Sequence, residues 1–209
     1  IKGQSDAKRG IEIAVAGMHN ILMTGTPGSG KTLLAKSIPS ILPNLNYDEI
    51  LEILKIKSIT DGISKEKIDI HRPFRSPHHT ITQMALIGGG RNPKPGEITL
   101  ANKGVLFLDE LTEFKEGILD SLREPLEEKR ITITRTNATV TYPCDFMLVS
   151  AMNPCKCGYY GHKIKKCTCT QKQIERYRSK LSEPFLDRID LYIEVQNIAI
   201  NEFSNDKCD

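Results

Sequence analysis

The sequence lacks any long uninterrupted apolar run, and no stretch approaches the roughly 18 residues that a membrane-spanning helix requires. Its first residues, IKGQSDAKRG, lack the basic and then apolar layout of a secretory signal peptide. Internal repeats and low-complexity segments are absent as well. We therefore expect no membrane partner and a cytoplasmic protein, whose reducing surroundings disfavour disulfides.

The composition is typical of an ordinary globular protein. With 209 residues, of which 39% are hydrophobic and 26% charged, the chain is long enough for one large domain or one domain with a small appendage. The net charge is only +3, but between Cys155 and Lys180 eight basic residues stand against a single acid, Glu175. Such a local excess can attract phosphate backbones, although it is more often only a solvated face.

Alternating strand and helix patterns predict an α/β fold. Buried strands are predicted for the apolar stretch that begins at Asn20, and for GVLFLDE, FMLVSA and IDLYIEV. Segments with helical spacing follow the first strand, beginning with LLAKSIPSIL and NYDEILEILKI. This alternation predicts a parallel sheet sandwiched by helices, with ligands at the carboxyl ends of the strands.

Several other segments carry predictions of their own. KEGILDSLREPLEEKR is expected to form one helix that Pro125 kinks. RITITRTNATVTYP alternates on both sides of a Thr-Asn pair and predicts a β-hairpin with Arg135 near its tip. DGISKEK is expected to be a loop and GGGRNPKPGEI to be irregular. A basic helix is expected after residue 170, with Ile174, Tyr177 and Leu181 on one face.

GTPGSGKT, residues 25–32, matches the phosphate-loop pattern GxxxxGK[ST] between an expected strand and an expected helix. The glycines let backbone N–H groups turn toward phosphate oxygens, and the positive end of the helix faces the same anion. Lys31 is expected to reach the β- and γ-phosphates of ATP, and Thr32 to bind Mg²⁺. The predicted cofactor-binding residues are Gly25, Thr26, Pro27, Gly28, Ser29, Gly30, Lys31, Thr32 and Asp109.

Polar residues that follow the later strands point to hydrolysis. Asp109 is expected to complete the Mg²⁺ shell, and Glu110 to act as general base for the attacking water. Asn153, just past FMLVSA, is placed to orient that water, or else is a cap or turn residue. Arg188 would compensate charge on the γ-phosphoryl oxygens, and its alternative role is an ion pair with an adjacent aspartate. The predicted catalytic residues are therefore Glu110, Asn153 and Arg188.

Together these motifs resemble a known family. The order of GTPGSGKT, VLFLDE, SAMNP and FLDRID resembles the AAA+ ATPases. Longer stretches, among them RPFRSPHHT, PGEITLANKGVLFLDEL, LREPLEEKRITITR and NPCKCGYYG, are similar to the magnesium-chelatase-like ComM (YifB) branch. The resemblance covers residues 3–195. It implies an AAA+ core over residues 1–195 and the start of a linker at 196–209. It also implies that the amino-terminal Lon-protease-like domain and the helical lid of such proteins lie outside this chain.

The resemblance also implies roles and partners. The implied roles are Walker A for Lys31 and Thr32, Walker B for Asp109 and Glu110, sensor 1 for Asn153, and an arginine finger acting on the neighbouring subunit for Arg188. A homo-oligomer, in the form of a hexameric ring with ATP between subunits, is implied as well. The resemblance further implies a bacterial helicase that drives DNA branch migration during natural transformation. Single-stranded or branched DNA is therefore the expected partner.

Three other functions fit parts of the sequence. A magnesium-chelatase motor subunit, which remodels a metal-insertion partner, would share every nucleotide residue; only the cysteine-rich segment and RPFRSPHHT argue against it. A transcription activator of the sigma-54 kind would carry a GAFTGA loop, and nothing similar occurs. A scaffold that binds ATP without turning it over would have no need of Glu110 as a base.

Two inserts are expected to face the pore of such a ring. They carry Arg91, Lys94 and Arg135 as candidate DNA contacts, because cations on pore loops can hold a sugar-phosphate backbone without reading its sequence. The alternative is that these are ordinary solvent-exposed loop cations. His78 and His79 have no third ligand at recognisable spacing, which favours packing or hydrogen bonding over a metal site.

Four of the six cysteines lie within residues 155–169, as two CxC pairs separated by nine residues. The candidate ligands of a tetrahedral Zn²⁺ are Cys155, Cys157, Cys167 and Cys169. His162 is an alternative ligand, and a redox pair or free thiols are the alternatives to a metal site. The remaining two cysteines, Cys144 and Cys208, are expected to be incidental. The cysteine-rich segment is thus predicted to be a small metal-clipped insert between Asn153 and Arg188.

Overall fold

The computed structural model describes residues 3–60, 71–136, 138–162 and 164–196 of the chain. The expected loop DGISKEK, Lys163, Cys208 and nearly all of the expected linker lie outside these ranges. Within them, none of the helices is both long enough and apolar enough to span a membrane.

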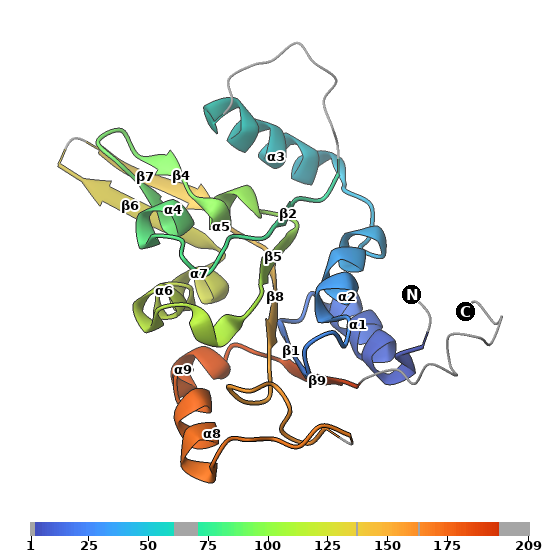
Figure 1. Ribbon diagram of the computed structural model, residues 1–209. Helices are drawn as coiled ribbons and strands as arrows, with labels where there is room; N and C mark the ends of the chain where they lie inside the picture. The colour runs from blue at the N-terminus through green and yellow to red at the C-terminus, as the bar shows by residue number, and fades with distance from the viewer. Residues whose placement is uncertain (1–2, 61–70, 137, 163, 197–209) are drawn as a thin grey trace.

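A five-stranded parallel sheet forms the centre of the molecule (Figure 1). Its strand order is β2-β5-β8-β1-β9. The strands are β1 (Ile21–Gly25), β2 (Phe74–Arg75), β5 (Val105–Leu108), β8 (Met147–Met152) and β9 (Leu191–Val195). The predicted parallel sheet is confirmed. Because all five strands point the same way, the segments that follow them meet at one edge.

Alternate residues of the strands face two separate cores, as the period of two requires. Met23 and Phe107 face one core, and Leu22 and Leu108 face the other. The first core is covered by α1 (Ser5–Gly17) and α2 (Lys31–Ser37), and the second by α6 (Glu116–Asp120), α7 (Arg123–Glu128), α8 (Gln171–Arg178) and α9 (Glu183–Leu186). Helices therefore cover both faces of the sheet, as predicted.

Helix α1 was not predicted from the sequence motifs, although its apolar residues recur at the spacing typical of a helix. Ala7, Ile11, Ala14 and Val15 recur at helical spacing, and all four are buried against the sheet. The helix ends at Met18, which adopts the left-handed conformation with a φ of 52°. The predicted basic helix is confirmed as α8, with Ile174 and Tyr177 buried. It ends at Arg178, however, so Leu181 is buried in the segment that follows the helix and does not lie on its face.

The segment 115–130 is not the single kinked helix that we predicted. It forms α6 and α7, which are separated at Ser121 and Leu122. Pro125 has no N–H to donate to the carbonyl of Ser121 and its ring crowds that carbonyl, so a continuous helix is interrupted one turn before the proline. Pro125 itself lies in the first turn of α7, where the missing N–H costs no hydrogen bond.

The segment GGGRNPKPGEI is not irregular, as we expected, but holds a small antiparallel hairpin. Its strands are β3 (Gly88–Gly89) and β4 (Lys94–Pro95). The second, predicted hairpin is confirmed as β6 (Arg130–Arg135) and β7 (Ala138–Pro143), with Arg135 paired to Ala138 at its tip. The other short elements are η1 (Ile38–Ser40), α4 (Gln83–Ile87), α5 (Glu97–Leu100) and η2 (Leu111–Glu113).

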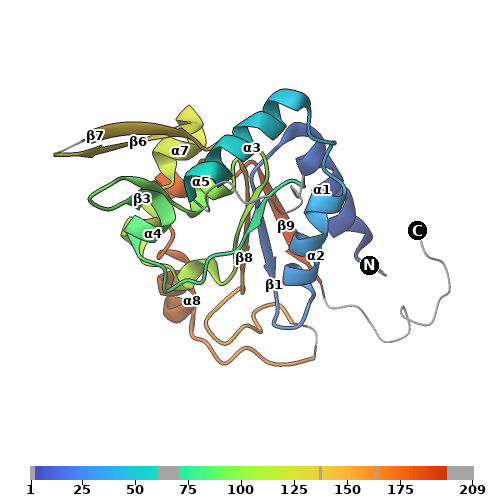
Figure 2. The same cartoon turned by 90° about the horizontal axis from the view of Figure 1, so that it is seen from above.

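The two hairpins lie side by side and project from one end of the molecule (Figure 2). Tyr142 of β7 donates from its hydroxyl to the carbonyl oxygen of Pro93 at 2.8 Å. The guanidinium of Arg135 lies over Gly89, where an added Cβ would be 3.0 Å from Nη2. Residues 49 positions apart (Tyr142 and Pro93) and 46 positions apart (Arg135 and Gly89) are thus in contact, and the two hairpins form one projecting unit.

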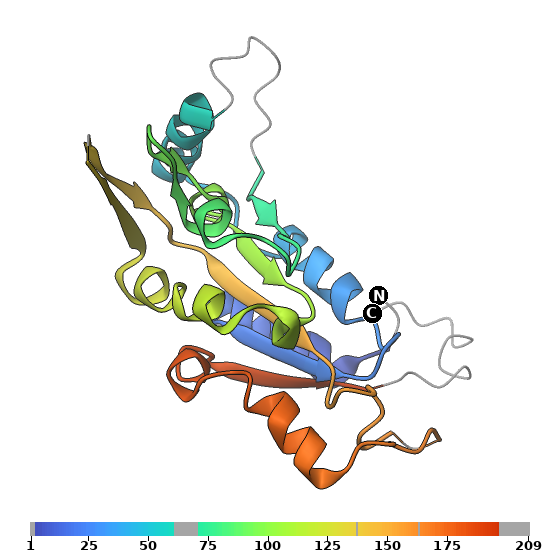
Figure 3. The same cartoon turned by 60° about the vertical axis from the view of Figure 1, so that its left-hand side comes forward.

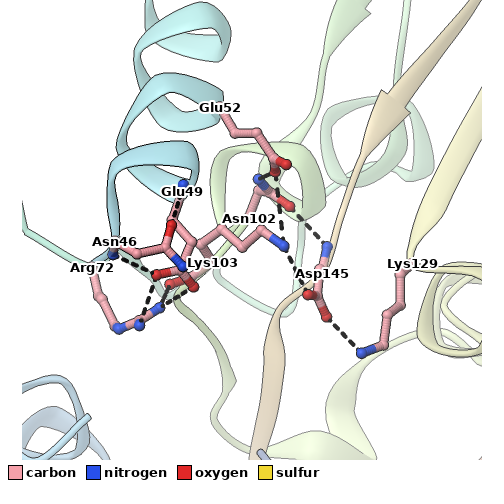
Figure 4. A network of polar contacts seen from close by, with 8 residues as sticks. All are labelled: Asn46, Glu49, Glu52, Arg72, Asn102, Lys103, Lys129 and Asp145. Carbon is pink, nitrogen blue, oxygen red and sulfur yellow. Dashed lines mark hydrogen bonds and ion pairs between the residues drawn. The ribbon is translucent and has the colours of Figure 1, made fainter. Parts of the chain in front are cut away.

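A polar network ties α3 (Tyr47–Thr60) to the connections between the strands (Figure 4). Arg72 donates to both carboxylate oxygens of Glu49 at 3.2 Å and to the carbonyl oxygen of Lys103 at 2.7 Å. Lys103 and Lys129 contact the two oxygens of Asp145 at 2.9 and 3.1 Å. Burial by itself would raise the pKa of Asp145, but the hydrogen bonds from the two lysines outweigh it and lower this pKa.

Candidate active site

The segment after β1 forms the predicted phosphate loop. Gly28 and Gly30 have φ angles of 79° and 92°, in the left-handed region that glycine adopts without steric cost. Ser29, between them, has a buried hydroxyl without a hydrogen-bond partner among the described residues. A phosphate oxygen is the kind of group that would satisfy it, so the loop fits a nucleotide.

Lys31, the first residue of α2, points its ammonium back into this loop. Its side-chain nitrogen donates to the carbonyl oxygens of Gly25 at 2.6 Å and Thr26 at 3.0 Å, and to Oδ1 of Asn153 at 3.2 Å. Burial lowers the pKa of Lys31, and the nearby carboxylate of Asp109 opposes this shift. The loop therefore holds the ammonium where the phosphates of a nucleotide would lie.

Thr32 and Asp109 meet at the same sheet edge. The Thr32 hydroxyl donates to Oδ2 of Asp109 at 2.8 Å, and the backbone N–H of Glu110 donates to Oδ1 at 2.9 Å. Hydroxyl and carboxylate oxygens are the ligands that Mg²⁺ prefers, usually together with water and substrate phosphates. These two side chains therefore fit the metal that the sequence predicts.

Glu110 has a partner that the motifs do not predict. Its side chain is 60% exposed, and Oε2 lies 3.4 Å from Nδ1 of His79. The ring of His79 packs on that of His78, with centroids 4.0 Å apart, and meets Phe114 edge-on at 6.3 Å. His79 and Glu110 are 31 positions apart in the chain. Only the pairing of β2 with β5 brings their segments together.

Arg188 lies at the opposite edge of the sheet from the phosphate loop. It precedes the amino end of β9, where Leu191 pairs with Ile21 of β1. Its backbone carbonyl accepts from Nδ2 of Asn20 at 2.9 Å, and its guanidinium pairs with Glu127 rather than with an adjacent aspartate. The five residues of β9, at about 3.3 Å each, separate Arg188 from the loop by about 16 Å. Arg188 therefore does not belong to the site of its own chain.

The surroundings of Arg188 are strongly polar. Arg188 and Glu127 line a cavity of about 660 Å³, together with further charged residues of α6, α7 and β6. The Nε atom of Arg188 is buried and has no hydrogen-bond partner within the described ranges. The guanidinium is thus held at a charged surface, with one donor unused.

The structure brings the four candidate zinc ligands together. The Sγ atoms of Cys155, Cys157, Cys167 and Cys169 all lie within 4.8 Å of one another, and three of their separations are 3.4, 3.5 and 3.7 Å. Four thiolates arranged tetrahedrally at about 2.3 Å from Zn²⁺ would be about 3.8 Å apart. His162 is not part of this cluster, and its Nδ1 accepts from two backbone N–H groups at 3.0 Å.

The thiol of Cys157 is the one most disposed to ionise in this cluster. Backbone N–H groups of Tyr159 and Thr168 donate to it and lower its pKa to about 5. A thiolate, not a thiol, is the form that binds a metal. In contrast, burial raises the pKa of the separate Cys144 to about 12, as is typical of an inert core thiol.

The three candidate DNA contacts lie on the paired hairpins. Arg91 follows β3, Lys94 begins β4, and Arg135 ends β6, and all three are exposed. The structure therefore brings these cations to one projecting end, although they come from two separate inserts.

The parallel sheet, the glycine-rich loop after β1 and the acids after β5 define a P-loop NTPase of the AAA+ class. Crystal structures of NtrX from Brucella abortus share this fold. The structure with ADP has a TM-score of 0.58 and 18% identity, over 94% of this chain and 37% of that chain. The structure with ATP has a TM-score of 0.56 and 20% identity, over 94% of this chain and 38% of that chain.

Residues 1–203 match the family model "Magnesium chelatase, subunit ChlI", and the chain belongs to this family. It is 51% identical to the uncharacterized protein YifB of Escherichia coli, over 92% of this chain and 38% of YifB. It is 48% identical to competence protein ComM of Haemophilus influenzae, over 98% of this chain and 40% of ComM. The predicted resemblance to the ComM (YifB) branch is confirmed. The chain spans about two fifths of the length of these relatives.

Proposed function

We propose that this chain is an ATP-hydrolysing motor domain. The observation that carries the proposal is the convergence of three segments at one sheet edge. Lys31 after β1 contacts Asn153 after β8, and Thr32 contacts Asp109 after β5. Each contact joins groups that phosphoryl transfer to water requires: a phosphate-binding cation, a metal-binding pair and a residue beside the γ-phosphate.

Each residue has one role in this reaction. Lys31 binds the β- and γ-phosphates, and Thr32 and Asp109 hold Mg²⁺, which neutralises charge on the phosphoryl oxygens when it is bound. Glu110 accepts a proton from the attacking water as general base, and Asn153 orients that water. The exposure of the Glu110 side chain leaves room for a water molecule beside it.

The nucleotide site is tested by Lys31→Ala, with Lys36→Ala as the matched control on the exposed side of the same helix. We expect Lys31→Ala to abolish binding of a fluorescent ATP analogue and Lys36→Ala to leave it unchanged. Equal affinity of the two variants for the analogue would remove the basis of the proposal.

We propose that the active assembly is a homo-oligomer, as a hexameric ring in the whole protein, with Arg188 acting on the site of the neighbouring subunit. The support is its place across the sheet from its own phosphate loop and beside a cavity lined by charged residues. An arginine supplied in this way is worth about 10³ to 10⁵ in turnover. Sedimentation of the full-length protein with and without a non-hydrolysable ATP analogue measures the assembly.

We further propose that the motor acts on single-stranded or branched DNA. The support is the similarity to competence protein ComM and the three exposed cations on the paired hairpins. Removing one cation that binds a phosphate of a single strand should reduce the slope of log K against log salt by about 0.7. We expect the double change Arg91→Ala with Arg135→Ala to weaken DNA binding and flatten this slope.

The matched control for the hairpin variant is Lys36→Ala with Lys55→Ala, which removes the same charge from exposed helix positions elsewhere. The decisive assay is ATP-dependent migration of a branched DNA junction by the full-length protein. A protein that hydrolyses ATP but does not move the junction at any salt concentration would contradict a DNA motor.

A second candidate function is supported by the family match itself: a magnesium-chelatase motor subunit that remodels a metal-insertion partner. It uses the same nucleotide residues, so ATPase assays do not distinguish it. Copurification with a chelatase partner, and ATP-dependent insertion of Mg²⁺ into a porphyrin, would favour it over the DNA motor.

We also propose that the four clustered cysteines bind Zn²⁺. Their sulfur separations fit a tetrahedral thiolate site, and a closed site of four protein ligands is a structural one. Elemental analysis of protein purified without chelator should find one zinc per chain. Its absence would leave a redox pair or free thiols as the interpretation.

A further inference from the structure

The cysteine cluster lies against the phosphate loop. The chain leaves β8 through Asn153 and enters the insert at once, and the insert runs beside the loop that follows β1 (Figure 3). Asn153 accepts a hydrogen bond from Lys31, and Cys155, two residues later, is completely buried. The first metal ligand and the nucleotide-contacting residues therefore share one short stretch of backbone.

Gly158 is the point of contact between the two sites. Its φ of 83° lies in the left-handed region, and its backbone N–H donates to the carbonyl oxygen of Cys155 at 2.9 Å. A Cβ on Gly158 would be 2.7 and 2.8 Å from Cδ and Cγ of Pro27 in the phosphate loop. The turn from Cys155 to Gly158, which carries two of the four thiols, is thus pressed against the ring of Pro27 with no space between them.

The other two thiols belong to a segment that is anchored independently. Cys167 and Cys169 immediately precede Thr170, whose side chain caps α8 in a capping box with Gln173. Helix α8 is held to the core by Tyr177, which is 8% exposed. A metal bound by all four cysteines would therefore tie the turn that touches Pro27 to a helix packed on the core.

The tip of the stretch between the two CxC pairs is exposed. Ile164 is 89% exposed, and Lys165 lies over the ring of Tyr159 at 4.9 Å. Arg178 of α8 contacts the base of the insert, where it lies over the ring of Tyr160 at 5.5 Å and donates to the carbonyl oxygen of Pro154 at 3.4 Å. A metal cross-link among the four thiols would add to these contacts and hold the turn more rigidly.

We propose that metal occupancy of the four-cysteine site controls the affinity of the phosphate loop for ATP. This inference rests on the proposed nucleotide and zinc sites. The loaded site braces the turn at Gly158 against Pro27 and fixes Asn153 beside Lys31, so the loop is pre-organised for phosphate. Without metal the turn loses this cross-link, and the nucleotide itself must order the phosphate loop when it binds. Linkage then requires ATP to tighten metal binding by the same factor, typically about 5- to 150-fold.

The first experiment uses the full-length protein and separates the coupling from the two sites on which it rests. We expect the double variant Cys167→Ser with Cys169→Ser to lose zinc, as seen by elemental analysis, and to bind a fluorescent ATP analogue at least about 5-fold more weakly. Cys144→Ala, which removes a thiol outside the cluster, is the control and should change neither quantity. Loss of zinc with unchanged ATP affinity would overturn the inference while leaving both proposed sites intact.

A second pair of variants tests the contact itself while keeping all four thiols. Gly158→Ala should retain zinc but lose ATP affinity, because its methyl group displaces Pro27. Gly161→Ala is the matched control: it has a similar φ of 77° in the same insert, but its Cβ would meet nothing within 4 Å. Equal ATP affinities of these two variants would contradict the proposed contact.

The reciprocal measurement needs no variant, and so it decides the case even if a cysteine variant fails to fold. The zinc affinity of the wild-type protein is measured by equilibrium competition with a chromophoric chelator, with and without a non-hydrolysable ATP analogue. We expect tighter zinc binding with the analogue, and equal affinities at saturating analogue would overturn the coupling. Wild-type protein without zinc refutes the zinc site, and zinc-loaded protein that does not bind the analogue refutes the nucleotide site.

Discussion

Replacing Arg188 by alanine is expected to stop ATP hydrolysis while leaving ATP binding intact. Arg188 lies beyond the amino end of β9, across the sheet from the phosphate loop of its own chain, and the five residues of this strand alone span about 16 Å. The Debye length at physiological ionic strength is about 8 Å, so this charge contributes almost nothing to its own site. If it acts on a neighbouring site, hydrolysis should fall by about 10³ to 10⁵, or about 4 to 7 kcal/mol in activation free energy.

The fold should survive this change. The ion pair between Arg188 and Glu127 is half exposed on the glutamate side, and pairs of this kind contribute about 0 to 1 kcal/mol to stability. Arg130→Ala is a matched control, because Arg130 lines the same cavity and pairs with Glu128 at 3.1 Å. Thermal unfolding of the two variants should differ little, whereas their hydrolysis rates should differ by orders of magnitude.

The assay combines equilibrium binding of a fluorescent ATP analogue, phosphate release and complementation. Arg188→Ala and Lys31→Ala are each expected to be inactive alone. Mixed assemblies would contain sites with an intact loop from one variant and an intact arginine from the other, so part of the activity should return. Binding that falls by the same factor as hydrolysis would refute this reasoning. So would mixtures that co-assemble but remain inactive.

Three further predictions follow from particular contacts. Glu110→Gln should bind ATP and trap it unhydrolysed, and unchanged phosphate release would refute its role as base. His79→Ala should lower kcat by less than the about 10²- to 10⁴-fold that loss of a general base costs, with KM for ATP unchanged and partial rescue by His79→Gln; a parallel rise in KM would indicate a binding role. Asp145→Asn should cost about 1 to 2 kcal/mol in urea unfolding at pH 7, because both lysine contacts lose a charge. Because the folded pKa of Asp145 is lowered, the wild-type advantage is complete above the unfolded pKa of about 3.9 and is lost as pH falls through the folded value. A difference between the two proteins that does not shrink as pH falls below about 3.9 would contradict this assignment.

The stability and catalytic predictions depend on different parts of the fold. The network around Asp145 joins α3 to the base of the β6–β7 hairpin, away from the sheet edge that carries Lys31. Substitutions in this network should therefore change the free energy of unfolding without changing the affinity for ATP. The reason is that substitutions at distant sites without shared partners usually have independent effects.

The secondary structure was predictable where a local pattern dominates. The strands around GVLFLDE and FMLVSA are buried on both faces and read as continuous apolar runs, so their type and approximate bounds follow from the sequence. The prediction was wrong for the helix containing Pro125, because the proline interrupts the helix at Ser121, one turn before itself. It was also wrong for GGGRNPKPGEI, because its strands have only two residues each. Strands this short cannot show the alternation of apolar and polar residues by which a strand is recognised in a sequence.

The sequence by itself determined the chemistry of the phosphate loop and the expectation that Lys31, Thr32 and Asp109 work together. It could do so because glycine-rich turns and strand ends are local features with a defined backbone geometry. Four cysteines in two close pairs likewise made a cluster of thiols, and with it a candidate metal site, predictable before any fold was known.

Only the tertiary structure decided which of these groups touch. The approach of Gly158 to Pro27, the contact of His79 with Glu110 and the position of Arg188 all join segments that are distant in the chain. Periodicity reports which face of an element is buried, but side-chain proximity depends on strand order and loop packing. The parallel pairing of β9 with β1 places Arg188 at the amino ends of the strands, across the sheet from the loop of its own chain.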